Sequence, residues 1–334
     1  MISLNVTGEI QRPLTHMALW GLAAILEDSG LRAVQCLFTE DLTPRAQLEV
    51  DADSVDVIGA VVREHAVKHA ENSWVTATMT HESDPGKGVM SPRLKPPSSP
   101  ESWSRLQQER YVQIGRLLKQ RMTLDLRMIG GLGEPAYWRC TERNTQPDQG
   151  ASRWEMKARN KGEEFVANRL AFLARAVAAR DAASVMGGVT GELVDDYVSK
   201  ADSRSATGFA PPGPVDSALV WCALWGLANF PVVHDGTNRS RTPGAQRWDR
   251  VHPDVMVVPV FTVPTAPARL RGVLRSHALD RMAAALVSHE PEAIQSQWLA
   301  EHGVRALMRF PVARLGSPSA PERRVLDGTV IPLE

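Results

Sequence analysis

Apolar and polar residues alternate along short stretches near the start of the chain, and apolar residues recur at helical spacing between those stretches. Alternation with period two predicts half-buried strands, and a spacing of three and four residues predicts amphipathic helices. The predicted elements are a strand over 2–6, a helix over 13–30, strands over 33–39 and 46–50, a helix over 54–70 and a strand over 74–80. This β-α-β-β-α-β order is that of the ferredoxin-like, or split βαβ, pattern.

The remainder predicts more helices and a second group of strands. Residues 201–215 contain the sequence Pro-Pro-Gly-Pro and are predicted to be a linker. The other predicted elements are a loop over 82–100, helices over 100–123, 163–186, 216–231, 269–288 and 292–302, a strand over 254–263, a strand pair over 304–315 and an edge strand over 329–333. We therefore predict an α+β protein. Its N-terminal domain, residues 1–200, holds the ferredoxin-like element with helical insertions and a basic region, and residues 216–334 form a second α+β domain.

One six-residue word, Ala-Leu-Trp-Gly-Leu-Ala, occurs at 18–23 and again at 223–228. Both copies lie in apolar runs with helical spacing. A glycine inside a helix lowers the stability of the helix by about 1 kcal/mol relative to alanine. The usual reason for such a glycine is the close approach of another backbone. We predict that Trp20, Gly21, Trp225 and Gly226 are helix-packing positions. The alternatives are a duplicated unit and two core helices that resemble each other by composition alone.

Charge and composition narrow the class of protein. The formal net charge is zero, but residues 103–180 and 236–281 each carry an excess of basic side chains. Such blocks favour local basic surfaces over general polyanion binding. The three cysteines are far apart, which fits a reducing cytoplasm and no cysteine-rich zinc site. No apolar run is long enough for a membrane span and no secretion signal is evident, so we expect a cytoplasmic protein.

Two basic segments are candidates for nucleic-acid contact, because arginine donates bidentately to guanine or phosphate, asparagine can recognise adenine, and aromatic rings stack on bases. The stronger candidate lies over 238–250 and the second over 138–161. The loop over 82–100 adds three more basic residues. The predicted contact residues are Asn238, Arg239, Arg241, Arg247, Trp248 and Arg250 in the first, Arg153, Lys157, Arg159 and Lys161 in the second, and Lys87, Arg93 and Lys95 in the third. The alternative is that these are solvated basic loops.

An enzyme has less support in the sequence. His65 and His69 are four residues apart on a predicted helix, so both rings could face one metal ion. Alanine follows His65, however, so the glutamate of a zinc-protease motif is missing. No nucleophile motif or phosphate-binding loop has the required spacing. We expect no catalytic residues, cofactor or metal, and keep a metal-dependent enzyme using His65 and His69 as the alternative, beside a protein-only scaffold subunit.

The repeated word also carries a family resemblance. An N-terminal strand, a proline-containing turn and the helix over 15–30, which ends in an acidic residue, serine and glycine, resemble subunits of type I CRISPR effector complexes. The segment over 216–232, which contains ALWGLANFPV, is similar to them too. The group that matches best is the Csb/Csx group of type I-U systems, also called I-G.

This resemblance implies a non-catalytic, large-subunit-like member of an RNA-guided antiviral surveillance complex. Its partners would be CRISPR RNA, double-stranded target DNA and RRM-like backbone subunits, with cleavage left to a recruited helicase-nuclease. Such a subunit would contact the short motif adjacent to the target and the displaced strand, while guide pairing supplies the sequence recognition. The resemblance transfers no individual contact residue, so the basic segments are chosen on physical grounds alone.

Overall fold

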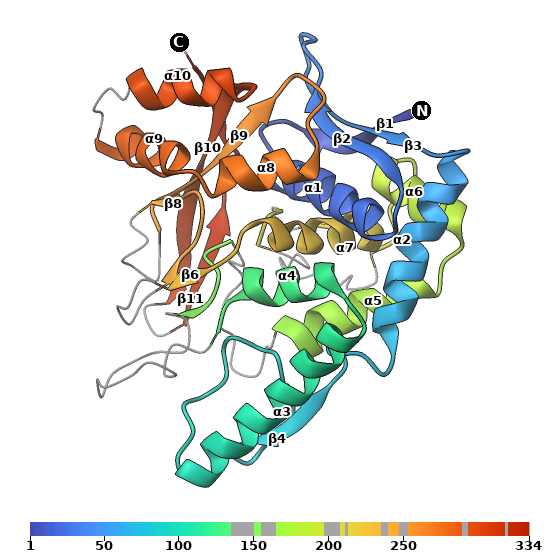
Figure 1. The fold of residues 1–334 in the computed structure, drawn as a ribbon, viewed down its shortest axis with the longest axis vertical. Coiled ribbons are helices and arrows are strands. Elements are labelled where there is room, and N and C mark those ends of the chain that lie inside the picture. Colours follow the sequence, from blue (N-terminus) through green and yellow to red (C-terminus); the bar gives the residue numbers. More distant parts are fainter. Residues whose placement is uncertain are drawn as a thin grey trace.

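The fold mixes helices and strands, as the α+β prediction required. The computed structural model describes residues 1–134, 150–154, 165–196, 208–210, 213–234, 240–246, 253–288, 293–317 and 320–333. Figure 1 shows one sheet near the N-terminus, a second sheet built by the C-terminal strands, and helices α1 and α7 between them.

The N-terminal sheet contains β1 (Ile2–Glu9), β2 (Arg32–Phe38) and β3 (Arg45–Asp51) in the order β1-β3-β2, with antiparallel neighbours. Helix α1 (Pro13–Asp28) connects β1 to β2, which leaves β3 between them as in a split βαβ unit. The register places Leu48 opposite both Leu4 and Cys36, and all three are buried. Alternation along the strands thus buries one face of the sheet against α1.

The predicted fourth strand does not join this sheet. Strand β4 (Thr78–His81) pairs instead with β5 (Asp84–Gly88) in a separate two-stranded sheet. Glu82 and Ser83 between them both have positive φ, 49° and 67°. A two-residue turn with positive φ at both positions matches the right-handed twist of paired strands, so this segment folds back on itself as a hairpin. The four-stranded ferredoxin-like sheet is therefore not formed among the described residues.

The C-terminal sheet is built around one long strand, β10 (Val304–Ser317), so the prediction of a strand pair over 304–315 is wrong. Strand β9 (Val255–Phe261) lies along one edge of β10, while β12 (Thr329–Pro332) and β11 (Ala320–Val325) lie along successive parts of the other. All seven residues of β9 are buried. This matches its continuous apolar sequence, which is typical of a strand covered on both faces.

Several predicted helices are divided. The predicted helix over 163–186 becomes a π-helical turn (Val166–Leu170), α5 (Ala171–Ala178) and α6 (Ala182–Thr190). Asp181 makes the break, because its carboxylate accepts the Ser184 backbone N–H at 2.7 Å and caps α6. The other helices are α2 (Val55–Ala70), α3 (Pro100–Lys119), α4 (Thr123–Leu132), α7 (Ser217–Trp225) with a 3-10 turn over Gly226–Asn229, α8 (Pro267–Leu274), α9 (His277–Ser288) and α10 (Ala293–Glu301).

The two copies of the repeated word pack against each other where α1 meets α7. A Cβ added at Gly21 would overlap the carbonyl oxygen of Cys222, and one added at Gly226 would overlap that of Met17. Met17 precedes Gly21 by four residues, as Cys222 precedes Gly226. Each glycine thus faces the equivalent residue of the other copy, and the contact is reciprocal. Trp20 and Trp225 are both buried beside it.

This contact crosses the predicted domain boundary. One hydrophobic core includes Leu22 of α1, Leu48 of β3, Leu224 of α7 and Val258 of β9. The backbones of Cys36 and Thr265 also pair, with N···O distances of 2.9 and 3.0 Å. Of the predicted linker, residues 208–210 and 213–215 are described, and Phe209 is buried. The division into two domains stays a prediction. No helix within the described ranges is long and apolar enough to span a membrane.

Candidate nucleic-acid interface

The two predicted basic segments contact each other in their described parts, 150–154 and 240–246, although 89 residues separate the contacting positions. The Arg153 backbone N–H donates to Oγ1 of Thr242 at 3.0 Å, and the Trp154 indole N–H donates to the carbonyl of Pro243 at 2.9 Å. Trp154 is fully buried, with its ring centroid 5.0 Å from that of Phe230. The segment over 151–154 is therefore fixed to the turn over 242–244. These contacts bring a part of each basic segment to the same place in the structure.

Arg153 itself lies inside the protein. The residue is fully buried, and its Nη1 donates to the carbonyl of Ala151 at 2.8 Å. Burial of a guanidinium is unfavourable unless hydrogen bonds compensate, so this arginine holds the local backbone together. Its guanidinium does not lie at the surface where the predicted contact would need it.

The turn that follows Arg241 packs closely against the C-terminal sheet. It joins β7 (Ser240–Arg241) to β8 (Ala245–Gln246) through Thr242, Pro243 and Gly244. Gly244 has φ +75°, and a Cβ there would overlap the carbonyl oxygen of Val257. The Val257 N–H donates to the Gly244 carbonyl at 2.8 Å. Only glycine fits this approach, and the contact fixes the position of Arg241.

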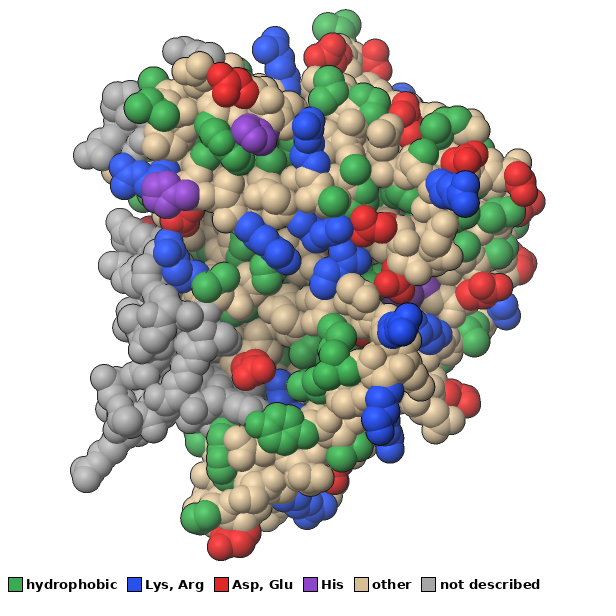
Figure 2. All heavy atoms as spheres, viewed as in Figure 1, with side chains coloured by type: hydrophobic (Ala, Val, Ile, Leu, Met, Phe, Trp, Pro, Cys, Tyr) green, Lys and Arg blue, Asp and Glu red, His purple; other side chains and the backbone are tan. Residues whose placement is uncertain are grey.

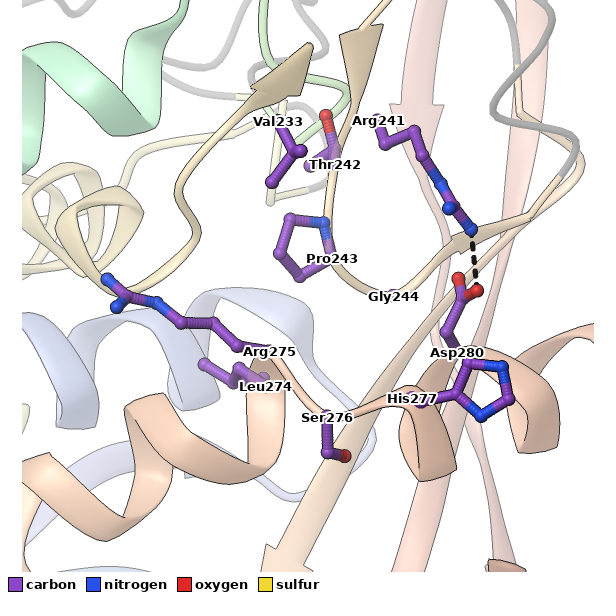
Figure 3. A pocket seen from close by; sticks show the side chains of 10 residues that line it. All are labelled: Val233, Arg241, Thr242, Pro243, Gly244, Leu274, Arg275, Ser276, His277 and Asp280. Carbon is purple, nitrogen blue, oxygen red and sulfur yellow. Dashed lines mark hydrogen bonds and ion pairs between the residues drawn. The ribbon is translucent and has the colours of Figure 1, made fainter. Parts of the chain in front are cut away.

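A hollow of about 280 Å³, here called the arginine pocket, lies between this turn and the α8–α9 corner (Figure 3). Arg241 and Arg275 lie on opposite sides of it. Nη2 of Arg241 is 2.6 Å from Oδ2 of Asp280, and both side chains are about two-fifths exposed. The lining residues are Val233, Arg241, Thr242, Pro243, Gly244, Leu274, Arg275, Ser276, His277 and Asp280.

The charge around the arginine pocket is positive. Asp280 offsets Arg241, whereas Arg275 is exposed and has no ion-pair partner among the described residues. Helix α8 also carries Arg269 and Arg271, and Figure 2 shows basic side chains gathered over this helix in the middle of the face. Arg271 pairs with Glu27 at 2.8 Å, so its charge is partly neutralised. An anion entering the pocket would meet Arg275, which has no carboxylate partner among the described residues, on one side and Arg241, which is paired with Asp280, on the other.

The other predicted contact residues are not brought to this place by the described structure. Lys87 lies in β5, and Lys95, which follows the hairpin in the chain, pairs with Asp84 of β5 at 2.7 Å. Arg93, also in this region, is partly buried. Figure 1 shows β4 of this hairpin beside α3 at the lower end of the molecule, away from β8. The predicted residues that lie outside the described ranges are Asn238, Arg239, Arg247, Trp248, Arg250, Lys157, Arg159 and Lys161.

The histidine pair of the enzyme alternative is buried in an aromatic cluster. His69 uses both ring nitrogens: Nδ1 is 2.6 Å from the His65 carbonyl and Nε2 is 2.6 Å from Oδ1 of Asp125. Nδ1 of His65 accepts the indole N–H of Trp221 at 3.2 Å. Burial, helped by the nearby charges of His69 and Lys68, holds the pKa of His65 well below its usual range.

These bonds turn the histidines toward structural partners and away from a shared ion. Within the described residues, no group of three His, Cys, Asp or Glu side chains has a metal-binding arrangement. Asp125 is the central residue of this cluster and also accepts the Trp74 indole N–H at 2.7 Å. Sequence reasoning missed Asp125, because it lies 56 residues from His69 on another helix and no local pattern marks it.

Comparisons of the chain with protein-family models, with curated proteins and with solved structures give no significant match. The resemblance to CRISPR effector subunits thus rests on the repeated word and its surroundings.

Proposed function

We propose that this protein is a non-catalytic, nucleic-acid-binding subunit of a ribonucleoprotein complex, as its resemblance to type I CRISPR effector subunits implies. The observation that carries the proposal is the junction of the segment over 151–154 with the turn over 242–244. These contacts hold one part of each basic segment next to the arginine pocket, which two arginines line. Arginine forks match phosphate oxygens, and several such contacts give most of the affinity of non-specific binding.

The sequence adjoining this junction supports the same function. Lys157, Arg159 and Lys161 follow Trp154 closely in the chain, and Arg239 and Arg247 flank the described turn. In the proposed complex, this surface contacts target DNA at the adjacent motif or along the displaced strand. Guide pairing supplies the sequence recognition, and a recruited helicase-nuclease performs cleavage.

Exposed apolar side chains on α3 favour a place in an assembly. Tyr111 is 62% exposed and Leu118 is 59% exposed, and these residues lie two helical turns apart on one face. Large apolar residues that share an exposed face are typical of protein interfaces. This observation fits contact with neighbouring subunits. It fits the protein-only scaffold alternative equally well, so nucleic-acid binding is the property to test.

The test uses the double variant Arg241→Ala/Arg275→Ala, with fluorescence anisotropy of a labelled DNA at several salt concentrations. We expect weaker binding and a shallower dependence of log K on log salt, because each lost phosphate contact lowers that slope by about 1. Arg105→Ala is the matched control, since Arg105 is an exposed arginine of α3, far from the arginine pocket. Equal binding by the double variant and the control would remove the pocket from the interface.

The wider assignment is tested by purifying the tagged protein from its host and sequencing the bound RNA. Repeat-derived guide RNA together with RRM-like partner proteins is the expected result. Recovery of protein partners without any nucleic acid would favour the scaffold alternative. A protein free of both partners and nucleic acid would contradict the assignment to a stable complex.

A further inference from the structure

A second hollow, here called the tryptophan hollow, adjoins the arginine pocket. It measures about 530 Å³ and lies between the α8–α9 corner and helix α10. Ser276 and His277 line both hollows, so one short stretch of chain separates them. The remaining lining residues are Gly272, Ala278, Ile294, Gln295 and Trp298. A positively charged pocket and a mainly apolar hollow therefore share one wall.

The corner between the hollows is a defined structural feature. The sequence predicted one helix over 269–288, but the helix is interrupted at Arg275 and Ser276. Oγ of Ser276 accepts the Leu279 N–H at 3.1 Å and donates to the Val273 carbonyl at 2.7 Å. The serine thus ends one helix and begins the next. This break places Arg275 on one side of the wall and Ala278 on the other.

The tryptophan hollow exposes apolar surface that the fold leaves unfilled. Ile294 is 79% exposed, and Trp298 lies one helical turn further along α10. The Trp298 indole stacks on His302 with ring centroids 3.7 Å apart and an angle of 20°. His302 in turn is held by a 2.7 Å contact between its Nδ1 and the Trp298 carbonyl. His302 thus covers one face of the indole, and Trp298 is also partly buried against the core, which holds the ring in place beside the hollow.

Gly272 leaves room for a ligand in the tryptophan hollow. It lies within α8 and lines the tryptophan hollow. Apart from the neighbouring residues and the backbone of the same helix, no described atom lies within 4 Å of a Cβ added at Gly272. A helical glycine is less stable than alanine by about 1 kcal/mol. Neither packing nor backbone conformation requires glycine here, since its φ is not positive. Space kept open beside a tryptophan is what an inserted flat group would use.

We propose that the two hollows together bind single-stranded nucleic acid, with a phosphate between Arg241 and Arg275 and an adjacent base stacked on Trp298. This inference rests on the proposed function and makes it more specific. A duplex keeps its bases stacked inside the helix and could use only the arginines. An unpaired strand offers both the anionic backbone and an apolar base face, which matches the two adjoining environments.

The experiment compares a labelled single-stranded oligonucleotide with a hairpin duplex of the same sequence, by anisotropy, for five proteins. They are the wild type, Trp298→Ala, Trp298→Phe, Gly272→Leu and Arg241→Ala/Arg275→Ala. We expect Trp298→Ala and Gly272→Leu to weaken single-strand binding about tenfold, within the range for loss of one stacked base. Duplex binding should stay unchanged in both variants. Trp298→Phe keeps an aromatic face and should retain most of the affinity.

The outcomes separate this inference from the proposed function. Unchanged single-strand affinity in Gly272→Leu and Trp298→Ala would overturn the stacking site, while the arginine variant still tests nucleic-acid binding. Equal losses on single strand and duplex would also overturn it, because the hollow would then serve no unpaired base. If no nucleic acid binds the wild type, the proposed function itself fails. Thermal denaturation checks folding, and Gly272→Leu is decisive because it adds atoms to open space without removing a contact.

Discussion

Glycines lie inside helices both in the α1–α7 junction and in α8, but their surroundings differ. Gly21 and Gly226 each face a backbone carbonyl of the opposite helix, where a Cβ has no room. Gly272 faces open space beside Trp298. The first pair lets two buried helices approach closely, and the third leaves a surface hollow unfilled. A glycine in a helical pattern therefore indicates a constraint, and only the structure tells whether that constraint is packing or an open site.

The largest expected effect is at the junction. Replacing Gly21 by leucine should cost about 3 kcal/mol or more of unfolding free energy, the upper end for overpacking, because the new side chain meets backbone. Gly226→Leu should behave alike, since the contact is reciprocal. Urea denaturation measures both. Gly115→Ala in α3 is the control, because an added Cβ there meets no described atom within 4 Å. Wild-type stability in both junction variants would show that this contact is not a close-packing point.

A second expected effect concerns His16, on the same helix as Gly21. The ring is fully buried, with centroids 4.5 Å from Phe38 and 5.5 Å from Trp20, and its Nε2–H donates to the Ile10 carbonyl at 2.6 Å. Burial lowers the pKa of His16 to about 4, despite the opposing hydrogen bond to Ile10. Below pH 6.5 the His16 imidazole of the unfolded chain takes up a proton, whereas the buried imidazole of the folded protein stays neutral.

The contribution of His16 to the free energy of unfolding should therefore be fully present above pH 6.5. It should be lost as the pH falls toward 4, and the total loss from this group should be about 3 kcal/mol. His65 acts in the same direction, because its pKa is also lowered by burial. The measurement is urea denaturation at pH 7.5, 6 and 5 for wild type and His16→Gln. We expect a weaker pH dependence in the variant. Identical pH profiles would mean that His16 does not stay neutral in the folded protein.

Much of the fold followed from local sequence patterns. The first three strands, the helices over 13–28 and 55–70 and the buried strand over 255–261 match the predicted elements closely, because each has a clear period of its own. The fourth strand was misplaced because Glu82 and Ser83 adopt left-handed conformations that glycine or asparagine would have signalled. The helix breaks at Asp181 and Ser276 were missed because a single capping side chain interrupts an otherwise helical pattern.

The candidate site was only partly visible in the sequence. The basic segments were marked by composition, but their meeting point depends on hydrogen bonds between residues 89 positions apart. Arg153 has the same residue type as Arg241 and yet is buried, and no sequence pattern distinguishes the two. The tryptophan hollow was missed altogether, because Gly272 and Trp298 come from different helices and meet only through the α8–α9 corner.

The smallest expected effect concerns Gly272. Gly272→Ala should raise the unfolding free energy by about 0.5–1 kcal/mol, because alanine is the better helix former and the added methyl group meets open space. Urea denaturation of this variant beside Gly21→Ala gives the contrast directly, since one substitution should stabilise the protein and the other should destabilise it. A loss of stability in Gly272→Ala would mean that α8 needs glycine for its own packing. The unfilled space beside Trp298 would then no longer point to a ligand, whereas a gain would agree with a hollow that has room for one.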